Sequence, residues 1–285
     1  MSGGTGYSYL LKDTIALALR EDIGHGDITS SLLIPENALA EAVIVAKEDF
    51  IVAGIPFVSE VFGVLDSSVQ VKVFSGEGTA VKKGDALAGL QGRALSILAG
   101  ERVALNILQR VSGIATLTST FVAKVKGLEV RIADTRKTAP GMRLMEKYGV
   151  AAGGGANHRF GLYDGVLIKD NHIKVAGGVR QAVGTAKKAH HLLKIEVEVK
   201  DHDELREALE AGADIIMLDN MSLQDMAEAV RIARGRGGVT PPLLEASGNV
   251  TLDNVRSIAE TGVDIISIGA LTHSARAMDI SMKVL

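Results

Sequence analysis

From residue 130 onward, short apolar runs alternate with amphipathic segments in a repeating order. The runs begin near Val130, Gly165, Lys194, Ala213, Pro242 and Val263. Several of the intervals are about 20 to 30 residues, which is the length of one strand plus one crossover helix. Segments 203–211 and 222–234 are amphipathic and long enough to form such a helix. The pattern therefore predicts an α/β fold with a parallel sheet.

The number of apolar runs limits how far this sheet can close. Six strands are clear, and a seventh is expected near Val150–Ala152. A complete eight-stranded barrel is not supported. An incomplete parallel α/β barrel of about seven strands fits the pattern, and so does an open parallel sheet.

The first part of the chain has a different pattern. Residues 10–21 carry apolar side chains at helical spacing, whereas 42–47 and 50–54 are expected to be strands joined by a short polar turn. Segment 69–74 alternates strictly, so one of its faces should be buried and the other exposed. Another short strand is expected at 86–90. This pattern is typical of an α+β domain.

A long helical pattern runs from about Ser96 to Lys124, and Ser112-Gly113 could kink or break it. We expect residues 1–125 to form an α+β domain and 126–274 to form the catalytic barrel. The segment 275–285 is expected to pack on the first domain.

The composition excludes several kinds of function. The chain has 285 residues, of which 47% are hydrophobic and 23% charged, as in an ordinary globular protein. Its net charge of −3 provides no basic field for nucleic acid, and it has no cysteine for disulfides, iron–sulfur clusters or thiol nucleophiles. We see neither a signal peptide nor an apolar run of the roughly 20 residues that span a membrane. A cytoplasmic location is therefore expected.

Cations follow the predicted strands. Arg136, Arg159 and Lys169 come after successive apolar segments, and in parallel barrels the carboxyl ends of the strands form the active site. One such cation is usually a solvated loop residue, but three in this position favour an anionic ligand such as a dicarboxylate. Lys137 and His158, which adjoin two of these residues, could face the same ligand or a second anion.

Carboxylates follow two further strands. Glu198 and Asp219 could simply form ion pairs with the nearby cations. Alternatively, they could accept hydrogen bonds from sugar hydroxyls or hold Mg²⁺ on a phosphate, because hard cations prefer oxygen ligands. Glu196 lies two residues before Glu198 and should point to the same side of its strand.

Small residues follow the last two strands. Ser247, Gly248 and Asn249 follow one, and Gly269 follows the other, each before a helical pattern. A glycine after a strand is usually a turn. However, backbone N–H groups at a helix start can bind phosphate, and in barrels the last two strand ends often do so.

These segments together resemble the quinolinate phosphoribosyltransferase family over nearly the whole chain. The resemblance rests on residues 134–138 (DTRKT), 157–159 (NHR), 168–172 (IKDNH), 196–198 (EVE), 218–220 (LDN), 245–248 (EASG) and 267–272 (SIGALT). It also includes residues 21–29 (EDIGHGDIT) and the segment from Glu101 to Thr116. So many motifs in the same order make the resemblance highly specific.

The resemblance implies an open-sandwich N-terminal domain, an incomplete seven-stranded barrel, and a homodimer whose partner subunit completes each site. It implies that Arg136, Arg159 and Lys169 hold quinolinate, joined by Arg102 from the neighbouring chain. The positions that match contacts to phosphoribosyl pyrophosphate, with Mg²⁺ on its pyrophosphate, are Lys137, His158, Glu198, Asp219, Ser247, Gly248, Gly269 and His273.

Within this set, Lys137, Glu198 and Asp219 are the expected catalytic residues, and the two carboxylates hold the metal only indirectly. Asn249 departs from the family, where many relatives have Gly. The activity implied is formation of nicotinate mononucleotide, pyrophosphate and CO₂ in NAD biosynthesis. Two other interpretations remain open. One is a paralogue of the same fold, of the type found beside molybdate transporters, and the other is a non-catalytic binder of phosphorylated metabolites.

Overall fold

The computed structural model describes residues 5–189, 192–236 and 240–285, and the chain divides into two compact units. Unit 1 consists of Met1–Ser119, Lys137–Gly154 and Ala270–Leu285. Unit 2 consists of Thr120–Arg136 and Gly155–Gly269. One of the four points where the chain passes from one unit to the other falls between Arg136 and Lys137, the two adjacent cations of the sequence motif.

Unit 2 contains a parallel sheet whose strands are β6 (Arg131–Ala133), β7 (Val166–Ile168), β8 (Ile195–Val199), β9 (Ile215–Asp219), β10 (Leu243–Ser247) and β11 (Ile265–Ser267). Their order across the sheet is β6-β11-β10-β9-β8-β7. The first strand thus pairs with the last, as in a barrel, but β6 and β7 are the two edges. This arrangement confirms the predicted incomplete α/β barrel and the position of its six clear strands.

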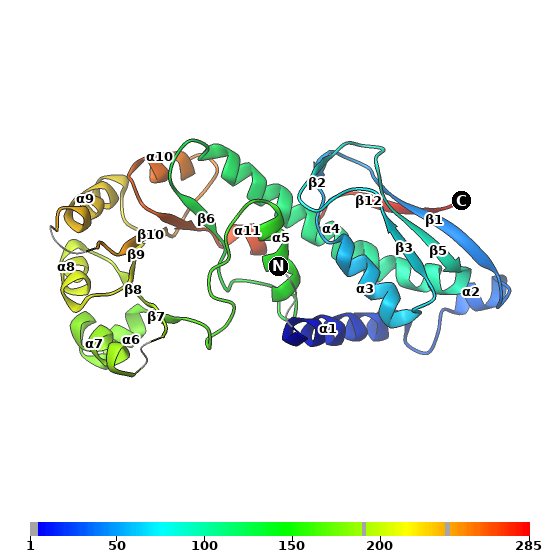
Figure 1. Ribbon diagram of the computed structural model, residues 1–285, viewed down its shortest axis with the longest axis horizontal. Helices are drawn as coiled ribbons and strands as arrows, with labels where there is room; N and C mark the ends of the chain where they lie inside the picture. Colours follow the sequence, from blue (N-terminus) through cyan, green and yellow to red (C-terminus); the bar gives the residue numbers. More distant parts are fainter. Residues whose placement is uncertain (1–4, 190–191, 237–239) are drawn as a thin grey trace. The chain divides into compact units, whose positions relative to one another are not determined.

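Helices follow the strands of unit 2 and cover the outside of the sheet (Figure 1). They are α6 (Asp170–Ala176), α7 (Val179–Ala189), α8 (His202–Ala211), α9 (Leu223–Arg234) and α10 (Val255–Glu260). Local sequence fixes their ends. The Asp201 carboxylate accepts hydrogen bonds from the first turn of α8, and Gly212 ends that helix at φ 74°, in the left-handed region that glycine favours.

The prediction of a seventh strand near Val150–Ala152 is wrong, because these residues end helix α5 (Arg143–Ala152) of unit 1. The apolar Val150 is fully buried on this helix. A three-residue apolar run does not distinguish a helix from a strand, and here the preceding helical turns decide the conformation. One further parallel contact does exist beside the five strand pairings of this sheet, as an isolated bridge between Ala133 and Ala156 next to β6.

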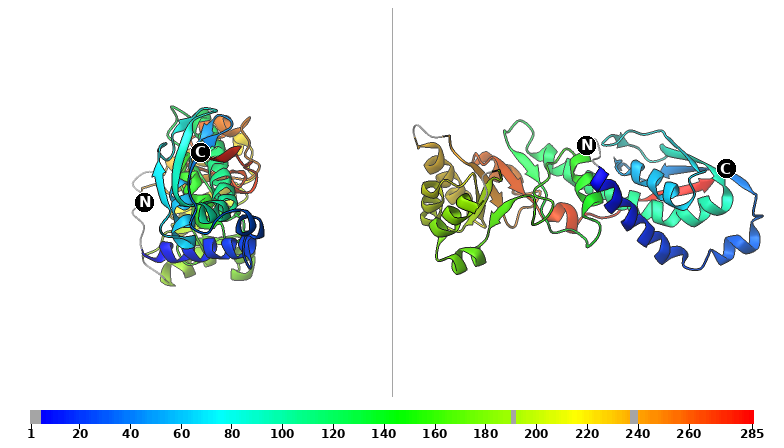
Figure 2. Two further views of the ribbon diagram at one scale, coloured as in Figure 1. Left: turned by 90° about the vertical axis from the view of Figure 1, so that its right-hand side faces the viewer. Right: turned by 60° about the horizontal axis from the view of Figure 1, so that its bottom comes forward.

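Unit 1 is organised around an antiparallel sheet in the order β12-β1-β5-β3. These strands are β12 (Ile280–Val284), β1 (Leu39–Ala46), β5 (Ala86–Arg93) and β3 (Gln70–Val73), and a separate pair consists of β2 (Phe50–Ile51) and β4 (Ala80–Val81). The helices are α1 (Thr5–Ile23), α2 (Ile28–Leu33), α3 (Ile55–Leu65), α4 (Ala94–Lys124), of which residues 120–124 count to unit 2, α5 and α11 (Ala270–His273). Figure 2 shows the same elements from two further sides.

Strand pairing in unit 1 differs from the local expectation. The strand predicted at 42–47 corresponds to β1, whereas the strand predicted at 50–54 is limited to Phe50–Ile51. The two do not pair with each other, because β1 lies between β12 and β5 while β2 pairs with β4. Strand β3 lies at an edge of its sheet, and its Val73 is 54% exposed. The alternation at 69–74 therefore buries less of one face than predicted.

Helix α4 is continuous, so the break considered at Ser112-Gly113 does not occur. Ser112 is fully buried, and its hydroxyl bonds both the N–H and the carbonyl of Ala53. A Cβ at Gly113 would overlap the backbone oxygen of Arg276, so this glycine permits close packing. Among the described residues, no helix combines the length and apolar character needed to cross a membrane.

Candidate functional site

Most of the predicted site residues of unit 2 lie at the carboxyl edge of its sheet. Arg136 follows β6, Lys169 follows β7, Glu198 lies near the end of β8, and Asp219 and Ser247 are the last residues of β9 and β10. Pairing places Glu198 and Glu245 each opposite Met217, so these residues and Asp219 and Ser247 share one face of the sheet. The fold thus gathers the predicted polar groups on one face.

A buried aspartate connects the two arginine-bearing segments. The Asp134 side chain, which directly follows β6, is fully buried and accepts a hydrogen bond from the backbone N–H of His158 at 2.8 Å. The backbone N–H of Asp134 in turn donates to the carbonyl of Ala156 at 3.1 Å. Arg136 and Arg159 are therefore carried by segments that Asp134 joins.

The two arginines interact electrostatically. The pKa of Arg159 lies below its ordinary value, first because the guanidinium is partly buried and second because of the positive charge on Arg136. Its Nη1 donates to the carbonyl of Gly165 at 2.9 Å, while its buried Nε has no hydrogen-bond partner within the described chain. Two neighbouring cations with limited access to water favour an anion between or beside them.

Lys169 and Glu198 form an ion pair with 3.0 Å between Nζ and Oε2. The bond agrees with the simpler interpretation of Glu198, although Lys169 remains half-exposed and able to contact a ligand. The backbone N–H of Lys169 donates to His172 Nδ1 at 2.9 Å, which gives His172 a structural role at the start of α6.

The loops after β9 and β10 contact each other through asparagine side chains. Asn220 and Asn249 both adopt left-handed backbone conformations, at φ 53° and 49°, and Asn249 Nδ2 donates to Asn220 Oδ1 at 3.0 Å. Gly248, which directly precedes Asn249, has φ 100°, and a Cβ there would overlap the Asn220 side chain. Gly248 is therefore required both by its backbone conformation and by the close approach of Asn220.

Three predicted residues belong to unit 1. Arg102 is exposed on α4, Lys137 is exposed after the unit boundary, and His273 ends α11. The carbonyl of Lys137 accepts a hydrogen bond from the Thr272 hydroxyl at 2.7 Å, which joins the Lys137 segment to α11. Gly269, the last residue of unit 2, directly precedes that helix.

Inside the sheet of unit 2 is a cavity of about 440 Å³. It extends toward the amino ends of the strands, where Arg131, Ile215 and Ile265 line it. Of the predicted site residues, His158 and Arg159 line this cavity, while the other predicted residues of unit 2 lie along the sheet edge. The two glutamates that line it, Glu196 and Glu245, were not among the predicted site residues.

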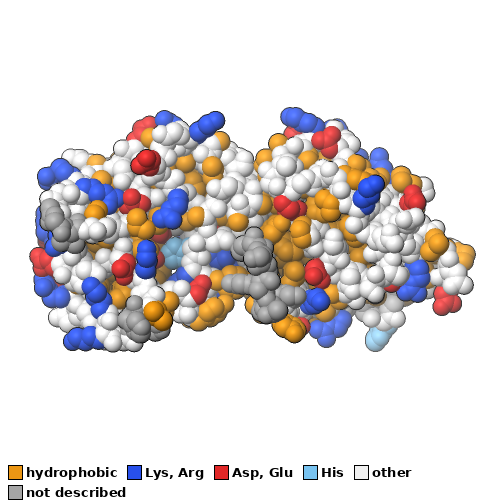
Figure 3. Space-filling model, viewed as in Figure 1, with side chains coloured by type: hydrophobic (Ala, Val, Ile, Leu, Met, Phe, Trp, Pro, Cys, Tyr) orange, Lys and Arg blue, Asp and Glu red, His pale blue; other side chains and the backbone are white. Residues whose placement is uncertain are grey.

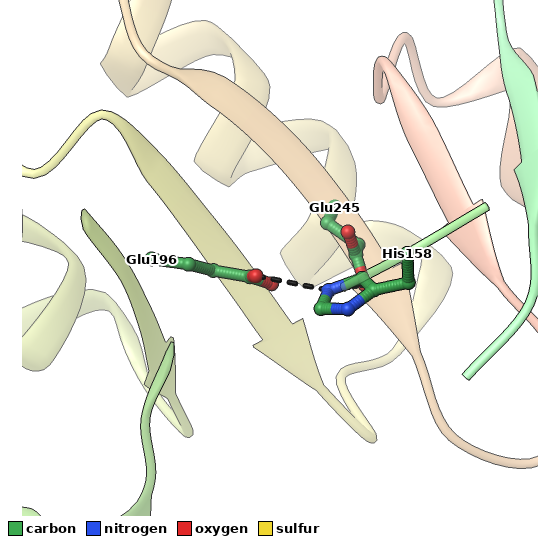
Figure 4. Close-up of side chains that lie close together, drawn as sticks. All are labelled: His158, Glu196 and Glu245. Atoms are coloured by element: carbon green, nitrogen blue, oxygen red, sulfur yellow. Dashed lines mark hydrogen bonds and ion pairs between the residues drawn. The ribbon is translucent and has the colours of Figure 1, made fainter. Parts of the chain in front are cut away.

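These glutamates form a cluster with His158 (Figure 4). His158 Nε2 lies 2.9 Å from Glu196 Oε2 and 3.8 Å from Glu245 Oε1. Glu196 and Glu245 are 5% and 1% exposed, and one oxygen of each has no hydrogen-bond partner within the described chain. The pKa of Glu245 is raised to about 7, first by burial and second by the negative charge of Glu196.

Sequence reasoning placed Glu196 on the site side of its strand but did not include Glu245. The signal for Glu245 is present, because it lies two residues before Ser247 and so shares its side of β10. In the sequence, Asp134 stands out only as the first residue of the motif at 134–138. Its role depends on the bridge between β6 and Ala156, which nothing in the local sequence indicates.

Comparison with known proteins agrees with this geometry over both units. Residues 27–112 match the model of the quinolinate phosphoribosyl transferase N-terminal domain, and residues 114–283 match that of the C-terminal domain. A Bacillus subtilis protein named "probable nicotinate-nucleotide pyrophosphorylase (carboxylating)" is 46% identical over 93% of this chain and 90% of its own. A rice chloroplastic nicotinate-nucleotide pyrophosphorylase (carboxylating) is 43% identical over 97% of this chain and 78% of its own.

Among solved structures, the nicotinate-nucleotide pyrophosphorylase from Francisella tularensis is similar to this chain with a TM-score of 0.91 and 42% identity. The match covers 97% of this chain and 96% of that one. Both domain models, the identity and the coverage lead to one conclusion: the chain belongs to the quinolinate phosphoribosyltransferase family.

Proposed function

We propose that the protein transfers a phosphoribosyl group from phosphoribosyl pyrophosphate to quinolinate and removes one carboxylate, which yields nicotinate mononucleotide, pyrophosphate and CO₂. The observation that carries the proposal is the pair Arg136 and Arg159, whose charges are close enough to lower the pKa of Arg159. A planar dicarboxylate matches two guanidinium groups because each can form two parallel hydrogen bonds to a carboxylate.

In this proposal the acceptor and the donor occupy different parts of the sheet edge. Arg136 after β6, Arg159 on the segment before β7 and Lys169 after β7 hold quinolinate. The donor takes the ends of β8 to β11, where Glu198 and Asp219 face its ribose, and Ser247, Gly248, Asn249 and Gly269 face a phosphate. Lys137 neutralises the pyrophosphate, with His158 and His273 as further predicted contacts to the donor.

Glu198 and Asp219 also fit the predicted metal. Both are carboxylates on adjacent strands, which suits the preference of Mg²⁺ for oxygen ligands, and Asp219 Oδ1 already accepts a hydrogen bond from Asn220 at 3.0 Å. They would hold Mg²⁺ indirectly, through the pyrophosphate that it accompanies. When bound, the ion neutralises negative charge on the leaving pyrophosphate.

The reaction needs positioning and charge neutralisation more than a covalent nucleophile. The quinolinate nitrogen forms a bond to the anomeric carbon as the bond to pyrophosphate breaks, and pyrophosphate leaves with the electron pair. Glu198 and Asp219 stabilise the positive charge that develops on the sugar. The bond from ring carbon 2 to its carboxylate then breaks, CO₂ leaves, and the electron pair beside the cationic ring nitrogen takes up a proton. The absence of cysteine agrees with this scheme.

We also propose a homodimer in which Arg102 reaches the partner subunit's quinolinate. Exposed apolar side chains on α1 and α2 support an interface on unit 1, because Leu17, Ile28, Leu32 and Leu33 are between 60% and 79% exposed. Hydrophobic side chains are visible on this unit in Figure 3, at the tip that holds α2.

Mixing two inactive variants tests the shared site. Arg102→Ala and Arg136→Ala subunits, dissociated and reassembled together, form hybrids with one intact site, so about a quarter of wild-type activity should return. No recovery after mixing, while wild-type subunits treated in the same way recover, would contradict the contribution of Arg102 across the interface.

The activity itself is tested by incubating the protein with quinolinate and phosphoribosyl pyrophosphate and measuring CO₂ and pyrophosphate. Equal release of both supports the proposal. A paralogue acting on another carboxylate would release neither from quinolinate, and a non-catalytic binder would bind the donor without turnover. Cell fractionation tests the predicted cytoplasmic location.

Substitution of one arginine tests the division between the two substrates. Arg136→Ala should raise KM for quinolinate on the order of 100-fold, the effect of losing a bidentate charged contact. Its Kd for phosphoribosyl pyrophosphate should change little. Equal losses for both ligands would refute the assignment of Arg136 to quinolinate.

A further inference from the structure

In the reaction described above, His158 is only a further predicted contact to the donor, and Glu196 and Glu245 have no role. Its three groups have the spacing of a metal site, since their ligand atoms lie within 4.8 Å of one another. Both glutamates are more than nine-tenths buried, and in each an oxygen lacks a hydrogen-bond partner within the described chain. Figure 4 shows both carboxylates directed toward the imidazole. Such an arrangement could bind either a metal ion or a proton.

The other ring nitrogen of His158 distinguishes these two possibilities. Nδ1 accepts a hydrogen bond from the backbone N–H of Arg159 at 2.9 Å, so it carries a lone pair and no proton. A neutral imidazole has one proton, which must then be on Nε2, and that N–H donates to Glu196 at 2.9 Å. A metal ion at Nε2 would need the lone pair there, which would leave both nitrogens without a proton. The geometry therefore favours protons over a metal.

We propose that Glu196 and Glu245 are positioning residues: they hold His158 as its neutral Nε2–H tautomer, and His158 Nδ1 in turn fixes the backbone of Arg159, the residue assigned to quinolinate. The proposal rests on the function proposed above only where it assigns Arg159 to quinolinate. The tautomer and its dependence on Glu196 are properties of the protein alone.

The charge of the cluster affects the same arginine. Glu245 faces Glu196 from β8, His158 from the segment before β7, Arg131 from β6 and Ser267 from β11. Its raised pKa means that Glu245 keeps a proton below about pH 7 and releases it above that pH. Above that pH Glu245 adds a negative charge to the cavity that Arg159 also lines, and this charge competes with the carboxylates of the substrate for the guanidinium.

Nuclear magnetic resonance of protein labelled with ¹⁵N-histidine measures the tautomer directly. His158 is assigned by the resonances that disappear in His158→Gln. We expect a protonated Nε2 and an unprotonated Nδ1 from pH 6 to pH 8. An imidazolium or an Nδ1–H tautomer at pH 7 would overturn the proposal, whether or not the protein acts on quinolinate.

Kinetics test the consequence for the substrate. Glu196→Leu removes the acceptor and should raise KM for quinolinate about tenfold, the effect of losing one hydrogen bond to a charged group. Glu196→Gln keeps an acceptor oxygen and should recover most of this loss. Comparable KM values for Glu196→Leu and wild type, in a folded variant, would contradict the positioning role.

The pH profile separates positioning from a purely structural role. In the wild type, KM for quinolinate should rise about threefold or more between pH 6.5 and 8.5 as Glu245 ionises. In Glu245→Gln this rise should be absent, whereas the exposed Glu207→Gln on α8, which removes the same charge, should behave like the wild type. An unchanged rise in Glu245→Gln would refute the role of the cluster.

A metal titration tests the competing interpretation. Stoichiometric binding of Zn²⁺ or Mn²⁺ that Glu245→Gln abolishes would overturn the assignment of a proton to this cluster. Weak binding that the same variant leaves unchanged would support it.

Discussion

The buried carboxyl of Glu245 makes a quantitative prediction about stability. Its pKa is raised from 4.5 to about 7 in the folded protein, mainly because burial disfavours the charged form and because Glu196 is close. Between these two values the unfolded chain has released the proton while the folded protein still holds it. The contribution of Glu245 to the free energy of unfolding must therefore fall as pH rises through this range, and it levels off above pH 7.

The size of the effect follows from the difference between the two pKa values. A difference of roughly 2.5 units at 1.36 kcal/mol each corresponds to about 3 kcal/mol. Glu245→Gln cannot ionise, so it lacks this loss. The stability of the variant relative to the wild type should thus increase by about 3 kcal/mol between pH 4.5 and pH 8.

Urea unfolding followed by circular dichroism, repeated at each pH, measures the difference. The comparison between variant and wild type removes the contribution of all other titrating groups, and Glu207→Gln serves as the control for an exposed carboxylate. A difference that stays constant within about 0.5 kcal/mol, or that falls as pH rises, would refute the argument. Glu196→Gln adds a second check, since it removes a charge that raises the pKa of Glu245 and should move the transition to lower pH.

Three further predictions concern packing and backbone conformation. Glu146→Ala should cost about 3 to 5 kcal/mol in urea unfolding, because Glu146 is fully buried and its loss leaves Arg110 without the partner that lies 2.8 Å away; a loss below about 1 kcal/mol would contradict this. Gly113→Ala should destabilise by about 1 to 3 kcal/mol through overlap with the facing backbone oxygen, whereas Gly63→Ala, in open space on α3, should stabilise by about 0.5 to 1 kcal/mol. Asn249→Gly should keep the KM for phosphoribosyl pyrophosphate within about twofold, since glycine adopts φ 49° without strain. Asn249→Ala should lower the free energy of unfolding by about 1 to 2 kcal/mol, because alanine is strained at this φ. Similar stability of these two variants would contradict a strained backbone at residue 249.

Most strands of unit 2 could be predicted from the sequence because they are largely buried and read as short apolar runs. Their carboxyl ends then located Arg136, Lys169, Glu198 and Asp219 at one edge. In unit 2 the strand positions that the local pattern predicts are therefore those of the folded sheet. The failure at Val150–Ala152 has the opposite cause, because a short apolar run is compatible with either conformation.

The strand pairing of unit 1 was less predictable because strands that pair with each other are distant in sequence. Nothing near residues 42–47 indicates that β1 pairs with Ile280–Val284, and a neighbouring apolar segment is the natural first expectation. The same limit applies to Glu245. A glutamate inside an apolar run gives no sign that Glu196 and His158, on other elements, lie close enough to change its pKa.

The distant pairing of β1 has a consequence for synthesis of the protein. Residues 280–284 are translated after all of unit 2, so β1 must wait for β12 while the rest of unit 1 and the whole of unit 2 emerge from the ribosome. During that interval one side of β1 exposes unpaired backbone N–H and carbonyl groups, which are a template for pairing with another nascent chain. Removal of β12 should therefore reduce the yield of recoverable protein in cells, even though the segment lies outside the proposed reaction.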